Sequence, residues 1–182
     1  MGMDKFLLKV DERTTFLEYL INQYTEFGCE TIVAVFNAQG VKIVNETFPE
    51  MGKRITIVCN SNPEWGRFCS LKQGLKEIHQ NQNVFIQNID NPFVNLAILY
   101  KLVDEIKCFD FSYPTFNGKG GHPVLISSTV KSAILQESSN DLNLKLFLKK
   151  FNEQVCPVDD ERVLLNINTP DDYKKIAHKL KQ

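Results

Sequence analysis

The ten residues from Val84 to Phe93, V-F-I-Q-N-I-D-N-P-F, constrain the fold of this chain more than any other stretch. Their β-branched and aromatic side chains predict a buried strand. Pro92 stops the strand because proline has no backbone N–H to donate. Residues 94–105 then take up helical spacing. We therefore expect Asp90 at the C-terminal end of a central strand, the edge where ligands bind in open α/β sheets.

Asp90 has two interpretations at this position. A carboxylate beside a turn can hold a divalent metal ion against a phosphate group. The alternative is that Asp90 only caps the helix that follows it. The local pattern does not separate the two.

The rest of the chain alternates between strand-like and helical segments. Extended segments are predicted at residues 31–36, 55–59, 109–115, 124–127 and 163–167, and helices at 16–27, 41–48, 67–79, 130–135, 142–151 and from 169 onward. Strands separated by helices imply right-handed crossovers. The sequence thus predicts a single α/β domain over 1–182, a three-layer Rossmann-like fold with a mostly parallel sheet and helices on both faces.

Composition excludes several classes of protein. The formal net charge of −1 gives no electrostatic reason to bind nucleic acid or a membrane surface. No apolar run approaches the length of a membrane span, and the N-terminus lacks a signal-peptide pattern. The five cysteines are dispersed, which favours reduced thiols. We expect a cytoplasmic protein that binds neither nucleic acid nor membranes.

Four short motifs occur in a particular order along the chain. They are Met1-Gly2-x-x-Lys5, then Asn62-Pro63-x-Trp65-Gly66 with Ser70 on the next helix, then Asp90-Asn91-Pro92-Phe93, and finally Gly121-His122-Pro123 with Asn166-x-Asn168-Thr169-Pro170. In this order the motifs resemble the cytidylyltransferases and guanylyltransferases of molybdenum-cofactor biosynthesis. These belong to the glycosyltransferase-A-like superfamily of NTP transferases.

The resemblance implies a reaction. A phosphate group of a small-molecule acceptor, such as molybdopterin, would attack the α-phosphorus of CTP or GTP with Mg²⁺ present, and CMP or GMP would be transferred. Such chemistry needs placement and charge neutralisation more than covalent catalysis. Two alternatives are a sugar or alditol phosphate as acceptor, and a non-catalytic relative that acts as a binding protein.

The resemblance also assigns roles to matched positions. The catalytic residues would be Asp90 and Lys5, and the nucleotide site would comprise Gly2, Lys5, Ser70 and Asp90. Asp90 and Asn168 would hold the metal ion, and Gly121 and His122 would lie near the acceptor.

Each role has a structural alternative. Asn168 could be a turn residue, Lys5 a solvated surface charge, and His122 a loop histidine without a catalytic role. Ser70 could only hydrogen-bond to the helix backbone.

The family pattern opens with an apolar strand and a loop of the form A-G-x-S-x-R-M-G-x-x-K, and this chain matches it only from the last Met-Gly. Backbone N–H groups of such a loop bind phosphates, and loss of the strand would leave sheet edges unpaired. The sequence is therefore expected to be truncated at its N-terminus relative to the family. Three explanations are open: a start further upstream in the gene, a degenerate relative, or a strand supplied by another segment or subunit. For the chain as written we expect poor NTP affinity and little turnover.

Overall fold

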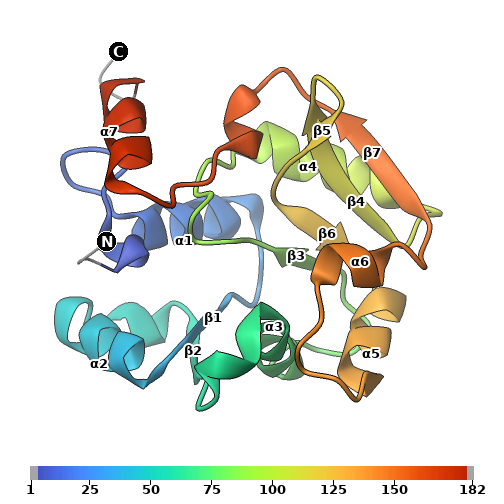
Figure 1. Ribbon diagram of the computed structural model, residues 1–182, viewed down its shortest axis with the longest axis horizontal. Helices are drawn as coiled ribbons and strands as arrows, with labels where there is room; N and C mark the ends of the chain where they lie inside the picture. The colour runs from blue at the N-terminus through green and yellow to red at the C-terminus, as the bar shows by residue number, and fades with distance from the viewer. Residues whose placement is uncertain (1–3, 180–182) are drawn as a thin grey trace.

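The computed structural model describes residues 4–179 and is a mixed α/β structure (Figure 1). Its helices are α1 (Phe16–Phe27), α2 (Ala38–Thr47), α3 (Gly66–Lys76), α4 (Leu96–Ile106), α5 (Ser128–Gln136), α6 (Leu144–Leu148) and α7 (Pro170–Lys179), with short 3-10 turns η1 (Lys5–Leu7), η2 (Met51–Lys53), η3 (Pro63–Trp65) and η4 (Glu161–Leu164). Its strands are β1 (Val33–Phe36), β2 (Thr56–Cys59), β3 (Val84–Ile86), β4 (Phe111–Phe116), β5 (Lys119–Gly120), β6 (Val124–Ile126) and β7 (Glu153–Pro157).

Local sequence signals explain where the best-defined helices begin and end. Thr15 and Glu18 form a reciprocal capping box at the start of α1, and Gly28 ends the helix at a φ of +98°, a conformation that glycine adopts without steric cost. The side chain of Asn95 accepts a hydrogen bond from the backbone N–H of Ile98 and caps α4. All the predicted helices are present in the structure; α1 has the predicted ends, and the others have shifted ends.

The sheet departs from the predicted mostly parallel arrangement. β1 and β2 form a separate parallel pair, while β3, β6, β4 and β5 follow one another in a second sheet in which β7 also pairs with β4 (Figure 1). In that second sheet only the β4–β7 pairing is parallel. The prediction of a mostly parallel sheet is therefore wrong for this part of the chain, because β6 returns from β4 and inserts antiparallel beside β3.

Each sheet has a strand edge that lacks a pairing partner among the described residues. The carbonyl oxygens of Ile32 and Phe36 accept hydrogen bonds from the backbone N–H groups at the two ends of β2. The backbone groups of the even-numbered residues of β1 therefore point toward β2. The backbone groups of Val33 and Val35 consequently point to the opposite edge. On β3, one edge pairs with β6. By the same alternation, the backbone N–H and C=O groups of Phe85 point to the opposite edge, which has no partner among the described residues.

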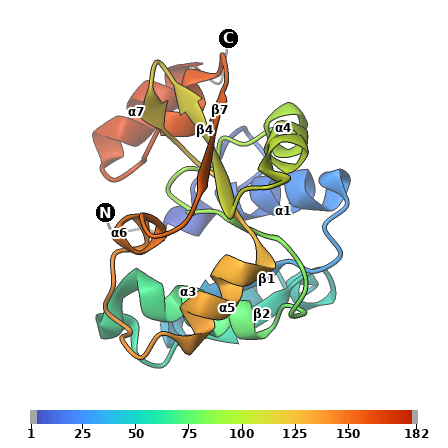
Figure 2. The ribbon, with the colours of Figure 1, turned by 90° about the vertical axis from the view of Figure 1, so that its right-hand side faces the viewer.

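Helices cover both faces of β3, because its successive side chains point in opposite directions. Val84 packs in a cluster with residues of α3 and α5, two helices that lie side by side (Figure 2). Phe85 packs with residues of α1 and α4 in another cluster. This local arrangement agrees with the predicted layers of helix, sheet and helix.

Two strand predictions need correction. The sequence predicts a strand over residues 163–167, but η4 and an irregular segment occupy this region, because the Asp160 side chain accepts from the Arg162 N–H and starts a 3-10 turn. The edge strand β7 is not predicted, since its sequence E-Q-V-C-P has little apolar character. Within the described range, no helix is both long and apolar enough to cross a membrane.

Candidate active site

Asp90 is buried in the turn that follows β3. The residue is 3% exposed, and its backbone carbonyl accepts a hydrogen bond of 2.7 Å from the N–H of Ile167. Because Asn95 caps α4 instead, the interpretation of Asp90 as a helix cap is wrong. Its carboxylate is available to the site.

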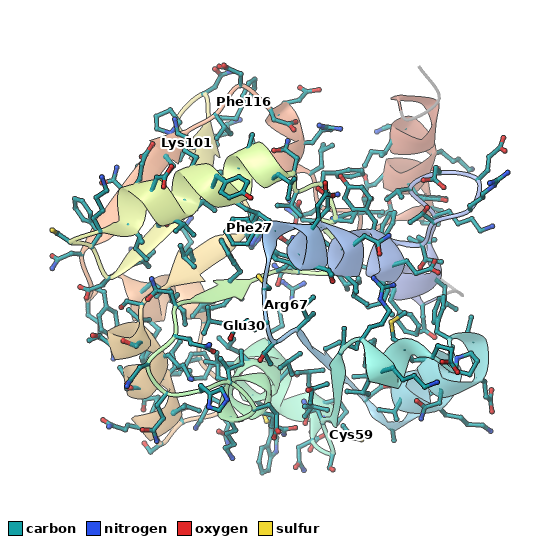
Figure 3. The ribbon with its side chains drawn as sticks, turned by 180° about the vertical axis from the view of Figure 1, so that it is seen from behind. Phe27, Glu30, Cys59, Arg67, Lys101 and Phe116 are labelled. Carbon is teal, nitrogen blue, oxygen red and sulfur yellow. The ribbon has the colours of Figure 1, made fainter. Side chains whose placement is uncertain are left out.

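Two cations contact one oxygen of this carboxylate. Asp90 Oδ2 lies 3.0 Å from Arg67 Nη2 and 3.5 Å from Lys5 Nζ. Arg67 comes from α3 and lies between α3 and α1 when the molecule is seen from behind (Figure 3). The other oxygen, Oδ1, is buried and has no hydrogen-bond partner among the described residues. A buried acceptor without a partner is costly, so this atom has unused capacity to bind a ligand.

Asn168 lies on the other side of Lys5. Its side-chain Oδ1 accepts a hydrogen bond of 2.7 Å from Lys5 Nζ. Lys5 thus links Asp90 to Asn168, and the fold brings together three residues that the motifs place far apart in the chain. The interpretation of Lys5 as a free surface charge is wrong.

The start of α7 holds Asn168 in place. The Asp172 carboxylate accepts from the backbone N–H groups of Asn168, at 3.1 Å, and Thr169, at 2.9 Å, while Thr169 Oγ1 accepts from the Asp172 N–H. The hydrogen bonds from Thr169 and Asn168 lower the pKa of Asp172. The carboxylate therefore stays charged and keeps the Asn168 backbone in one position.

The donor set fits a hard divalent cation. Asp90 and Asn168 both present oxygen atoms, and Asp90 Oδ1 is without a partner in the described part of the chain. Mg²⁺ is commonly held by one or two carboxylates together with water and substrate phosphates. The described residues contain no cluster of three or more His, Cys, Asp or Glu that could bind a metal without such help.

His122 reaches the same region from the loop before β6. Its Nε2 lies 3.1 Å from Asn88 Nδ2, and its Nδ1 is buried without a partner among residues 4–179. Burial is the main cause that lowers the pKa of His122, and the Arg67 charge lowers it further, while Asp90 acts in the opposite direction. The imidazole is therefore neutral at pH 7.

The carbonyl oxygen of Val163 organises this loop. It accepts from the backbone N–H of His122 at 3.0 Å and from Asn91 Nδ2 at 2.7 Å. Gly121 packs directly against it, and a Cβ atom built on Gly121 would lie 2.5 Å from that oxygen. Gly121 is thus needed for close backbone approach, and the His122–Pro123 peptide bond that follows is cis.

Ser70 lies in a separate polar cluster at the end of β2. Its Oγ accepts a hydrogen bond of 2.9 Å from Asn60 Nδ2, and Asn60 Oδ1 in turn accepts from Gln73 Nε2 and the N–H of Asn62. Ser70 lies one turn beyond Arg67 on α3, on the same side of that helix. Gly2, predicted to bind phosphate, lies outside the described residues.

Sequence reasoning missed several polar residues of the site, namely Arg67, Asn88, Asn91 and Asn60. The asparagines Asn88 and Asn91 flank Asp90 within the stretch that ends the central strand, so their position was a usable signal. Arg67 could have been found from its place three residues before Ser70 on the predicted helix. Its contact with Asp90 depends on how α3 packs.

Solved structures of similar fold were compared with the whole chain. The complex of Rv0371c from Mycobacterium tuberculosis H37Rv with manganese has a TM-score of 0.79 at 20% identity, covering 97% of this chain and 93% of that one. Molybdopterin-guanine dinucleotide biosynthesis protein A from Archaeoglobus fulgidus has a TM-score of 0.69 at 20% identity, covering 99% and 92%. The 4-diphosphocytidyl-2C-methyl-D-erythritol synthase from Anaerococcus prevotii has a TM-score of 0.75 at 14% identity, covering 100% and 92%. At these identities the likeness shows a shared fold.

Sequence comparison gives the family. No curated protein matches the chain. The model of the MobA-like NTP transferase domain matches residues 1–155. Because this match spans most of the sequence, the chain belongs to the family of MobA-like NTP transferase domains.

Proposed function

We propose that this protein transfers CMP or GMP from CTP or GTP to a phosphorylated small molecule, with Mg²⁺ bound by Asp90 and Asn168. The observation that carries the proposal is the Asp90 carboxylate, which is buried, touches Lys5 and Arg67 through one oxygen and leaves the other without a partner among the described residues. Family membership supports the reaction class.

The residues of the site suit transfer at phosphorus. An oxygen of the acceptor phosphate would form a bond to the α-phosphorus, and the bond between that phosphorus and the pyrophosphate oxygen would break. Several negative charges must come close together for this step, so neutralisation and alignment contribute most of the rate. Lys5 supplies a compact charge, and Arg67 supplies a planar donor that can bind a phosphate through two N–H groups.

The metal ion would neutralise charge on the triphosphate and hold it in one orientation. Asp90 offers a charged ligand, and Asn168 offers a weaker, neutral one. The structural neighbour Rv0371c was solved as a complex with manganese, which supports a divalent ion in proteins of this fold. This neighbour supports a divalent cation as the class of metal and does not single out Mg²⁺.

Two classes of acceptor follow from the structural neighbours. The Archaeoglobus protein is named for molybdopterin-guanine dinucleotide biosynthesis, which points to a molybdopterin acceptor. The Anaerococcus protein is named as a diphosphocytidyl-methylerythritol synthase, which points to an alditol phosphate. We favour a pterin acceptor, in keeping with membership of the MobA-like family. His122, neutral and in contact with Asn88, would lie near the acceptor.

The first test is calorimetric titration of the full chain with CTP and with GTP, each with and without Mg²⁺. Binding of one nucleotide that requires Mg²⁺ and is lost in Asp90→Asn would support the site and identify the base. Asp104→Asn on the exposed side of α4 is the matched control. A folded protein that binds neither nucleotide would contradict the proposal.

The second test separates an enzyme from a binding protein. Pyrophosphate release is measured with the preferred nucleotide and either a molybdopterin or an erythritol phosphate acceptor. Release that depends on one acceptor would identify the substrate. Nucleotide binding without release with any acceptor would favour a non-catalytic relative.

A further inference from the structure

Lys5 occupies the space between the two groups that would bind the metal ion. Its ammonium lies 2.7 Å from Asn168 Oδ1 and 3.5 Å from Asp90 Oδ2. An ammonium has three N–H donors and no acceptor, so these contacts engage Asn168 Oδ1 and Asp90 Oδ2, while Asp90 Oδ1 has no partner among the described residues. The Lys5 ammonium is thus a cation already held between Asp90 and Asn168.

The buried carboxylate needs this charge. The Asp90 side chain is 5% exposed, and a buried ion is costly unless it is paired and hydrogen-bonded. Lys5 and Arg67 together provide that pairing. The Lys5 side chain is 28% exposed and the Arg67 side chain 77% exposed, so both remain in reach of solvent and can leave the carboxylate.

A divalent ion and the Lys5 ammonium cannot share these ligands. Mg²⁺ binds its oxygen ligands at about 2.0–2.1 Å in an octahedral shell. Two cations bound to the same carboxylate and amide would lie within a few ångströms of each other and repel strongly. Lys5 must therefore leave Asn168 Oδ1 before a metal ion on Asp90 can also bind that oxygen.

The backbone near Lys5 is fixed while its side chain is free to move. The next residue, Phe6, is 7% exposed and packs edge-to-face on Phe36 with ring centroids 5.2 Å apart. The Lys5 carbonyl accepts from the Leu8 N–H at 3.1 Å. The four-carbon side chain can therefore swing out of the site without unfolding η1.

We propose that Lys5 is an internal counter-cation, which holds Asp90 and Asn168 together in the metal-free protein and competes with the divalent metal ion for them. When the metal and triphosphate bind, Lys5 leaves the two oxygens and becomes available to a phosphate group. This inference rests on the proposed function and describes how that site is regulated. Competition by Lys5 would make metal binding weak in the free protein and would couple metal binding to the binding of the nucleotide.

The test is the affinity for Mn²⁺ in the absence of nucleotide, measured from the electron paramagnetic resonance signal of free Mn²⁺. Lys5→Met removes the competitor and is expected to tighten Mn²⁺ binding about tenfold, the size expected from the loss of one charge-assisted hydrogen-bonded contact. Lys9→Met removes the same charge four residues away, where Lys9 Nζ bonds the Glu12 carbonyl, and is expected to leave the affinity unchanged. Asp90→Asn is expected to abolish binding.

The outcomes decide the proposal. Unchanged or weaker Mn²⁺ binding by folded Lys5→Met would overturn it, and so would absence of Mn²⁺ binding by both the wild type and this variant. Measurable binding by Lys5→Met alone would support it. An equal gain in Lys9→Met would also overturn it, because the effect would then be one of general charge.

A second measurement on the wild-type chain covers the case in which Lys5→Met does not fold. The lysine side-chain signals are followed by NMR during a titration with Mg²⁺, with Lys5→Arg used to assign the Lys5 signal. We expect the Lys5 signal to shift and the Lys9 signal to stay. A Lys5 signal that does not move at saturating Mg²⁺ would overturn the inference.

These results are distinguishable from failure of the proposed function. Tighter Mn²⁺ binding by Lys5→Met in a protein that binds no nucleotide would reject the function and keep the competition. Nucleotide binding that depends on Mg²⁺ and Asp90, with no gain in Mn²⁺ affinity, would reject the competition alone.

Discussion

The backbone N–H of His122 donates a hydrogen bond of 3.0 Å to the carbonyl oxygen of Val163 and fixes the histidine loop against the segment before α7. Both segments border the buried carboxylate, since Ile167 of the second one bonds the Asp90 carbonyl. The contact therefore joins the segment that leads to Asn168 to the histidine loop. Residues that maintain it should affect stability and the site together.

Gly121→Ala is expected to destabilise the protein by about 1–3 kcal/mol, the usual cost of overpacking a filled space. The added Cβ would lie 2.5 Å from the Val163 oxygen, so the backbone must shift. Chemical denaturation measures the loss. Gly52→Ala is the control, because its added Cβ would meet nothing within 4 Å, and a loss of similar size there would contradict the explanation.

The stability of the protein should decrease as the pH falls below about 6.5, the ordinary pKa of histidine. The pKa of His122 is lowered in the folded state, mainly by burial, so the unfolded chain binds a proton more readily. Protonation then favours unfolding between the ordinary pKa and the lower folded-state pKa. Denaturation at pH 8, 6 and 5 should show this decrease, and His122→Asn should reduce it. An unaltered pH dependence in that variant would count against the assignment.

Hydrogen exchange should distinguish alternate residues of β1. The amides of Ala34 and Phe36 face β2 and should be protected, whereas those of Val33 and Val35 face an edge without a described partner and should exchange faster. Residue-resolved exchange by NMR measures this directly. Equal protection along β1 would mean that another segment pairs with this edge.

Lys131→Met is expected to destabilise the protein by about 1–3 kcal/mol, because it removes two hydrogen bonds from a charged donor to backbone carbonyls. Lys131 is 1% exposed and donates to the carbonyls of Ile78 and His79, after the end of α3. Burial lowers the pKa of its ammonium. Thermal unfolding tests the change.

Lys149→Met, at an exposed position, is the control for the loss of a lysine charge. An equal decrease in that variant would contradict a specific role for the buried contacts of Lys131.

The order of elements could be predicted from the sequence because it depends on local signals. Thr15, Glu18 and Gly28 set the ends of α1, and Asn95 caps α4 shortly after Pro92. The prediction that Asp90 ends a central strand is corrected by the structure: β3 stops at Ile86 and lies at one end of its sheet among the described residues, and Asp90 is in the turn that follows. The structure places Lys5, Asp90 and Asn168 in one site, as the order of the motifs suggests.

Other features depend on contacts between distant segments. The antiparallel insertion of β6 beside β3, the irregular path at residues 163–167 and the approach of Arg67 to Asp90 are each fixed by tertiary packing. The single carbonyl of Val163 that unites Gly121, His122 and Asn91 has no local signature. Sequence by itself determined the helices and the strand that precedes Asp90, because periodicity and capping act over a few residues. Only the tertiary structure decided strand direction and which charges meet, because those depend on which surfaces are buried together.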